Sequence, residues 1–191
     1  MIAQISPLVE GEHSRMRRLH ILGGAVGGAV SGLSLGLAGA GLAAANPTLQ
    51  PLGAAALLAI AIWAAAVDLG FTSPVRVPSR QTPQVWECAL GPSSASFAWG
   101  VDLGTGITTR PAFVSVAVLV GAALIVASPF WSMFIMISYG IGKAGAVALA
   151  VNAHSARDTC DAIASHHGRI TNGAVAAALC MAALLAVGLL S

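Results

Sequence analysis

The sequence contains very little charge. Only 8% of its 191 residues are Asp, Glu, Lys or Arg, and aromatic residues make up 5%. Between Arg18 and Asp68 no charged side chain occurs. Apolar residues reach 57% and the mean hydropathy is +0.83. This leaves too little polar surface to face water on all sides, so the composition excludes a soluble globular protein and predicts an integral membrane protein.

Basic residues and cysteines are also few. The net charge is +2, and the nine basic residues are too scattered for a nucleic-acid surface, so no nucleic-acid partner is predicted. The three cysteines, Cys88, Cys160 and Cys180, form no C-x-x-C pair. They indicate neither a disulfide framework nor a thiol-exchange motif. No cofactor is predicted.

The apolar runs predict an all-α membrane bundle. A spanning helix needs about 20 residues, and runs near this length cover 20–45, 51–70, 111–128, 130–152 and 171–190. A weaker segment rich in Gly and Ser covers 88–107. We expect five full transmembrane helices plus a broken or re-entrant helical segment at 88–110. In a six-span alternative, 88–107 crosses the membrane completely.

The arginines favour five spans. A five-span topology places all of them on one side: Arg15, Arg17, Arg18, Arg76, Arg80, Arg110, Arg157 and Arg169. Six spans would move three of these to the other side. Because basic loops stay cytoplasmic, we expect a cytoplasmic N-terminus in a bacterial-type cytoplasmic (inner) membrane.

These expectations describe a single membrane domain over 1–191. Its parts are a cytoplasmic tail (1–19), a first helical hairpin (20–70), a cytoplasmic linker with the broken or re-entrant segment (71–110), a second hairpin (111–152), a cytoplasmic loop (153–170) and a last span (171–191). The expected partners are the lipid bilayer and either further copies of this chain or a larger membrane or enzyme partner.

The first run carries a stripe of small residues. Four glycines recur at a spacing of four residues, and other small residues accompany them: Gly24, Gly28, Gly32 and Gly36, with Gly23, Gly27, Ser31 and Ser34 alongside. Such a stripe lets another helix approach closely. It is interpreted either as ordinary helix packing or as a sliding surface used in alternating access.

A short motif occurs twice. Val67-Asp68-Leu69-Gly70 returns as Val101-Asp102-Leu103-Gly104, and a tryptophan precedes each copy, at Trp63 and at Trp99. The motif suggests a duplicated half, although four matching residues also arise by chance in a chain of this composition.

Lys143 lies near the middle of the run 130–152, where a lysine costs on the order of 3 kcal/mol to insert. A carboxylate partner would compensate it. Tyr139 precedes Lys143 by four residues and so shares its helical face, which Ser132 extends. If the protein is an enzyme, the predicted catalytic residues are Lys143, Tyr139 and Asp102, with Tyr139 as acid or base. The alternative is a buried Lys–Asp pair that only sets helix register.

Asp102 is the expected partner because glycines surround it in the segment from Trp99 to Gly106 and permit a broken helix. The following Thr108-Thr109-Arg110-Pro111 is typical of a helix start, where exposed amides can hold an anion. The predicted substrate-binding residues are Asp102, Arg110, Thr108, Thr109, Lys143 and Trp99. An ordinary capped helix with a solvated arginine is the alternative.

A polar loop follows the fourth run. Its residues include metal-ligand types, His154, Cys160, His166 and His167, but their spacing matches no zinc pattern. No metal site is therefore predicted, these four residues are only weak candidates, and a solvated loop is the favoured interpretation. His13 and His20 flank the first run and are expected to be interfacial.

The segment from Phe97 to Pro111 leads into an apolar helix and resembles the broken helix of CcdA/DsbD-type (LysE-like) multi-pass membrane proteins. That family carries a Pro-Cys pair at the break and shuttles electrons with a second cysteine. Here Asp102 and Leu103 occupy the region. The resemblance therefore implies a multi-pass architecture without the redox function.

Three functions remain open. The first is a transporter or carrier subunit with a polar intramembrane site for protons or for a small or amphipathic anionic substrate. The second is a membrane-embedded enzyme, or the membrane subunit of one, that acts by acid–base chemistry on a lipid or apolar peptide. The third is a structural or assembly subunit of a larger membrane complex.

Overall fold

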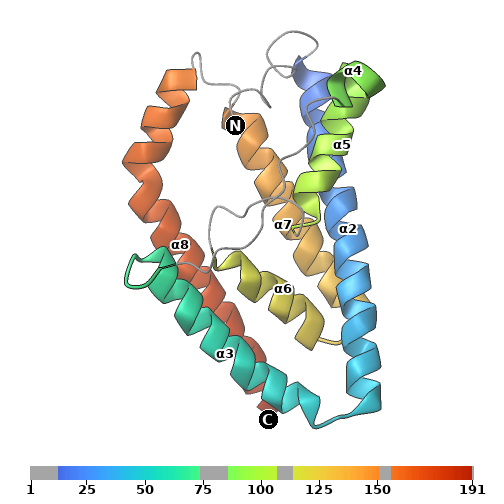
Figure 1. Cartoon of the computed structure of the whole chain (residues 1–191), viewed down its shortest axis with the longest axis vertical. Helices are drawn as coiled ribbons and strands as arrows, with labels where there is room; N and C mark the ends of the chain where they lie inside the picture. The colour runs from blue at the N-terminus through green and yellow to red at the C-terminus, as the bar shows by residue number, and fades with distance from the viewer. Residues whose placement is uncertain (1–12, 74–85, 107–113, 151–155, 191) are drawn as a thin grey trace. The chain divides into compact units, whose positions relative to one another are not determined.

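The computed structural model describes residues 13–73, 86–106, 114–150 and 156–190, and these residues form helices and connecting turns with no strand. The helices are α2 (His13–Ala45), α3 (Leu49–Asp68), α4 (Trp86–Leu90), α5 (Pro92–Gly104), α6 (Val116–Ile125), α7 (Pro129–Ala150) and α8 (Ala156–Leu190) (Figure 1). The predicted all-α class is confirmed.

Four helical segments are long and apolar enough to cross a membrane: Ser14–Ala45, Leu49–Asp68, Pro129–Ala148 and Gly168–Gly188. They correspond to four of the five expected runs. The run 111–128 instead contains the ten-residue α6, about 15 Å long, or half of a hydrocarbon core of about 30 Å. The segment 88–107 contains the end of α4 and the thirteen-residue α5 in place of one crossing helix.

The first two spans are separated at Asn46 and Pro47, which lie between the predicted runs 20–45 and 51–70. Proline cannot continue a helix because it lacks an N–H donor, and α2 ends at Ala45. The Asn46 Oδ1 atom accepts hydrogen bonds from the Thr48 amide at 3.1 Å and from the Thr48 hydroxyl at 2.7 Å. This side-chain turn leads the chain into α3.

The chain divides into two compact units, with the boundary inside α2, α7 and α8. The first unit comprises Met1–Ser31, Ser79–Arg110 and Met136–Ser165. The second unit comprises Gly32–Pro78, Pro111–Ile135 and His166–Ser191.

Three helices of the first unit meet at three glycines. A Cβ atom on Gly104 or on Gly140 would collide with the backbone carbonyl of Gly24, and one on Gly24 would lie 2.5 Å from the carbonyl oxygen of Gly140. We call Gly24, Gly104 and Gly140 the glycine crossing. Only residues without a side chain allow α2, α5 and α7 to approach this closely.

α5 runs parallel to α2. A Cβ on Gly23 would meet the Phe97 carbonyl, and one on Gly27, a turn later, would meet the Val101 carbonyl. A step of four residues toward the C-terminus of α2 is therefore matched by a step of four residues toward the C-terminus of α5. Figure 1 shows α5 beside the first half of α2.

α7 runs antiparallel to α2. Gly24 faces the backbone of Gly140. Gly28 lies one turn later on α2 and faces the backbone of Met136, which lies one turn earlier on α7. Adjacent glycines of α2 therefore serve different neighbours, because Gly23 and Gly27 accommodate α5 while Gly24 and Gly28 accommodate α7.

In the second unit the stripe continues against the start of α7. A Cβ on Gly32 would lie 2.5 Å from the Ser132 carbonyl oxygen, and one on Gly36 would lie 2.6 Å from the Pro129 Cα. A Cβ on Gly39 would meet the carbonyl of Leu124 on α6. The close approach predicted from the small-residue stripe is confirmed, and helices of this same chain make it.

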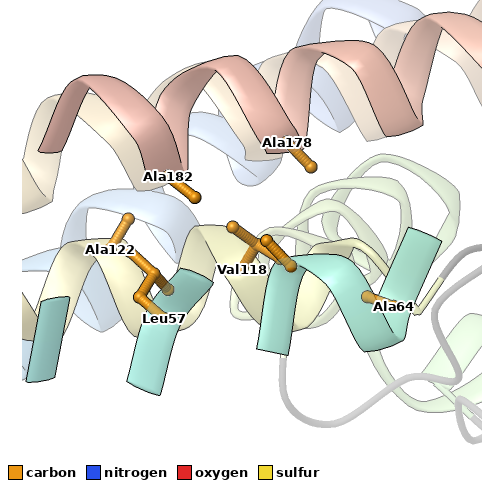
Figure 2. Packing of buried hydrophobic residues seen from close by; sticks show 7 residues of the cluster. Leu57, Ala64, Val118, Ala122, Ala178 and Ala182 are labelled. Carbon is orange, nitrogen blue, oxygen red and sulfur yellow. The ribbon is translucent and has the colours of Figure 1, made fainter. Parts of the chain in front are cut away.

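The core of the second unit is built mainly from alanine. Figure 2 shows buried side chains of α3, α6 and α8 turned toward one another. The cluster consists of Leu57, Ala61, Ala64, Val118, Ala122, Ala178 and Ala182. Small side chains let the three helices pack closely, as is usual between helices in membranes.

The first copy of the repeated motif ends α3. The amide of Phe71 donates to the carbonyl of Ala66 at 2.8 Å, and the amide of Gly70 donates to that of Val67 at 2.9 Å. Gly70 has a φ of +82°. These features define a Schellman C-terminus, which needs a left-handed residue at the position of Gly70.

Asp68 joins the end of α3 to the start of α6. Its carboxylate accepts hydrogen bonds from the amides of Val114 at 2.8 Å and Ser115 at 2.9 Å, and from the Ser115 hydroxyl at 2.7 Å. A carboxylate is favourable there because the N-terminus of a helix carries unsatisfied N–H groups and partial positive charge.

The second copy of the motif is placed differently. Gly104 is still helical and forms part of the glycine crossing, and the left-handed residue is Gly106, with a φ of +70°. Asp102 consequently lies farther inside its helix than Asp68 does. The two copies are similar in sequence but occupy different helical positions, so they give no support to a duplicated half.

We predict that Gly140→Ala lowers the stability of the protein by about 1–3 kcal/mol, because the new methyl group would collide with the Gly24 carbonyl. Thermal unfolding of the purified protein in detergent measures this. Gly142→Ala is the matched control, since nothing lies within 4 Å of a Cβ at Gly142. Equal melting temperatures for the two variants would contradict the close packing.

We also predict that Asp68→Ala destabilises the protein by about 2 kcal/mol, because α6 loses three hydrogen bonds at its N-terminus. Ser115→Ala removes only the hydroxyl bond and should cost about 1 kcal/mol. The same unfolding measurement compares them, and an Asp68→Ala protein as stable as the unmodified chain would show that the cap is unimportant.

Candidate functional site

The candidate site begins on α7, where the only lysine and the only tyrosine of the chain lie one turn apart. The Nζ atom of Lys143 is 5.6 Å from the centroid of the Tyr139 ring. This is within the range at which an ammonium group is attracted to an aromatic face. Gly140 lies between the two residues in sequence, so the glycine crossing holds this part of α7 against α2 and α5.

Asp102 supplies the opposite charge from α5. Its side chain is buried, with 9% exposed, and its carboxylate interacts electrostatically with Lys143. The structure therefore brings together the two charged residues that the sequence pairs. Their roles in binding or catalysis stay predictions.

Trp99 lies one turn before Asp102 on α5. Its side chain is 5% exposed, and residues three apart share a helical face. The indole and the carboxylate are thus neighbours in the buried part of the first unit. Its predicted role in substrate binding stays a prediction.

Tyr139 has a buried hydroxyl group with no hydrogen-bond partner among the described residues. The end of α5 packs against its ring, because a Cβ on Gly106 would lie 3.0 Å from the Tyr139 Cε1 atom. Buried polar groups normally find a partner. Within the described part of the chain, the hydroxyl therefore makes no hydrogen bond, on a ring that the Lys143 ammonium group approaches.

His20 is buried among the helices of the first unit, with 3% of its surface exposed, and its expected interfacial position stays a prediction. Its Nδ1 atom is 3.0 Å from the Ser96 carbonyl oxygen and must donate, since a carbonyl only accepts. The Nε2 atom has no partner among the described residues. The sequence signal was present, because His20 precedes Gly24 by four residues and so continues the small-residue stripe.

Ser132, which extends the polar face of α7 in the sequence, belongs to the second unit. Its buried hydroxyl donates a hydrogen bond to the carbonyl of Ala123. This bond links the start of α7 to α6, so the hydroxyl has a structural role.

The remaining predicted substrate-binding residues, Thr108, Thr109 and Arg110, lie outside the described residues. Their predicted contact with an anion stays a prediction.

The weak metal-ligand candidates also fall where side chains are not described. His154 lies outside the described residues, as do the side chains of Cys160, His166 and His167 on α8. Within the described part of the chain, no group of three or more His, Cys, Asp or Glu side chains could hold a metal ion.

Comparisons with protein-family models, curated proteins and solved structures gave no match to this chain. The resemblance to CcdA/DsbD-type proteins therefore stays a prediction. Cys88 and Cys180, the cysteines whose side chains are described, are exposed and carry free thiols.

We predict that Tyr139→Phe leaves the stability unchanged or raises it by up to about 1 kcal/mol, because the variant removes a buried hydroxyl that lacks a described partner. Ser132→Ala is the control, since it removes a buried hydroxyl that does have a partner, and should cost about 1 kcal/mol. Thermal unfolding distinguishes them. A clear destabilisation by Tyr139→Phe would reveal an intramolecular partner for the phenol.

Proposed function

We propose that this protein is a small multi-pass membrane carrier, or the carrier subunit of a larger complex, with a polar intramembrane site around Lys143, Asp102 and Tyr139. Its cargo is a small or amphipathic anion, or protons. The observation that carries the proposal is the electrostatic interaction of Lys143 with Asp102 between two helices packed at glycines.

The energetic cost of these charges supports a functional role. A lysine or an aspartate at the centre of a membrane helix costs roughly 2.5–3.5 kcal/mol on insertion scales. Apolar residues of similar volume would hold the same helices without that cost. Charges inside membrane segments commonly mark ion or substrate pathways. The Tyr139 phenol, which has no hydrogen-bond partner among the described residues, adds a donor in the same part of α7.

The helix directions support the five-span topology. Because α2 and α7 are antiparallel, the chain must cross the membrane an even number of times between them if both cross it. α3 is one such crossing. A single further crossing within 69–128 brings the number to two, as the five-span topology requires. In the six-span alternative three crossings would intervene, which would make α2 and α7 parallel.

The end of α5 supports a broken helix inside the membrane. α5 stops at Gly104, beside Gly140, which lies near the middle of the candidate span Pro129–Ala148. Irregular backbone at membrane depth is tolerated where protein or a wet cavity surrounds it. Carriers place substrate sites at such helix breaks, and here Gly106 and Tyr139 adjoin the break. We therefore propose that 88–110 is a re-entrant segment.

The arginine distribution supports a cytoplasmic N-terminus in a bacterial-type inner membrane. A purely structural role has less support than transport, because the small-residue stripe of α2, which could pack against a partner protein, is covered by α5, α6 and α7 of the same chain. An enzyme that uses the same three polar residues is the second alternative.

Transport by proteoliposomes tests the proposal. Vesicles containing a trapped pH-sensitive dye would be supplied with radiolabelled lactate or phosphate, and both anion uptake and internal pH would be followed. We expect Lys143→Met to reduce the protein-dependent flux at least about tenfold, because an interaction with the lysine charge is worth well over 1.4 kcal/mol. Ile141→Ala, at an exposed position of the same helix, is the control and should transport normally.

The double variant Lys143→Met/Asp102→Asn separates transport from folding. Removing one charge leaves the other unpaired and should destabilise the protein by about 3 kcal/mol or more, whereas removing both restores much of that stability. We expect the double variant to fold but not to transport. Normal flux in this variant would show that the Lys143–Asp102 pair is not needed for transport and only sets helix register.

A further inference from the structure

The Lys143–Asp102 pair is electrically balanced. The ammonium and carboxylate groups contribute opposite unit charges, and their attraction offsets part of what the Lys143 ammonium loses on burial. Asp102 is almost completely buried. Any anion that reaches Lys143 would therefore add an unbalanced negative charge next to a carboxylate in a poorly solvated place.

Two groups beside the pair can bind an anion. The Lys143 ammonium lies over the face of the Tyr139 ring. The phenol hydroxyl of the same residue is buried and lacks a hydrogen-bond partner among the described residues. An ammonium group and a hydroxyl group both donate hydrogen bonds, so each of the two groups can offer a hydrogen bond to an anion.

We infer that the site binds one monovalent anion together with one proton, which the Asp102 carboxylate takes up as the anion displaces it from Lys143. The inference rests on the proposed function and identifies its cargo as the conjugate base of a monobasic acid, carried with its proton.

The charges balance at each stage. Before binding, the site holds a carboxylate and an ammonium. As the anion enters, a proton from solution forms an O–H bond on Asp102, and the ammonium exchanges the carboxylate for the anion. The loaded site then holds a neutral carboxylic acid and an ammonium–anion pair. Its net charge is zero in both states, so neither state leaves an unpaired charge in the membrane.

Other titratable groups lie on the helices that pack against α5. Among the described side chains they are Arg15, Arg17, Arg18 and His20 on α2, Cys88 on α4, and Tyr139 and Lys143 on α7. His20 is the main competitor for the proton, but its ring binds the carbonyl of Ser96, almost two turns before Asp102 on α5.

The test measures anion binding and proton uptake together on the full-length protein in lipid nanodiscs. The probe is radiolabelled thiocyanate, a monovalent anion that stays ionised throughout the pH range used. We expect its affinity to rise as the pH falls, by up to about tenfold per pH unit. In weakly buffered solution, binding should remove about one proton per anion.

Variants identify the group that takes the proton. Asp102→Asn carries a neutral amide, so it should bind thiocyanate with a pH-independent affinity and without proton uptake. Lys143→Met should bind at least about tenfold more weakly, because the ammonium is lost. His20→Gln should retain proton uptake. Proton uptake that persists in Asp102→Asn, or disappears in His20→Gln, would overturn the assignment to Asp102.

The wild-type protein alone also decides the question, should a variant fail to fold. Binding without proton uptake would overturn the coupling, and the absence of binding at every pH would overturn the monovalent-anion class. Failure of the proposed site has a different signature, because thiocyanate would then bind equally well to Lys143→Met. Binding that needs Lys143 but takes up no proton would leave the proposed anion site intact.

Discussion

The contact of three backbones at the glycine crossing is the constraint on which the rest of the first unit depends. Gly24, Gly104 and Gly140 bring α2, α5 and α7 so close that any side chain there would meet a carbonyl or a main-chain carbon. The close contact places the C-terminal end of α5 beside Gly140 of α7. It therefore decides that the carboxylate of α5 and the ammonium of α7 share one neighbourhood, although 41 positions in the numbering separate Asp102 from Lys143.

Packing of this kind suits a protein surrounded by lipid. Between membrane helices the hydrophobic effect contributes little, because the hydrocarbon outside is as apolar as the protein, so association relies on dispersion contacts and hydrogen bonds. The first unit uses glycine to bring main chains together, and the second uses glycine along α2 and mainly alanine in the cluster of α3, α6 and α8. The larger apolar side chains point outward, as exposed residues such as Leu37, Ile62 and Leu184 show.

The sequence predicted those features that depend on local chemistry. The break at Pro47, the close approach along the small-residue stripe and the all-helical class follow from residue type and spacing alone. The length of the helix in the run 111–128 could not be predicted. The run is apolar over most of its length, but α6 begins only after the amides of Val114 and Ser115 that Asp68 caps. The burial of His20 was not predicted either, although His20 lies four residues before Gly24 on the small-residue stripe. Its hydrogen-bond partner is a main-chain carbonyl of α5.

The polar cluster of the first unit contains the one phenol and the one side-chain amine of the whole chain. A protein grown with a single isotope-labelled amino acid, tyrosine or lysine, would therefore carry its label at this one place. Magnetic resonance or infrared spectra of such a sample would contain one signal from each group, and every change in that signal would report on the same few ångströms of the molecule.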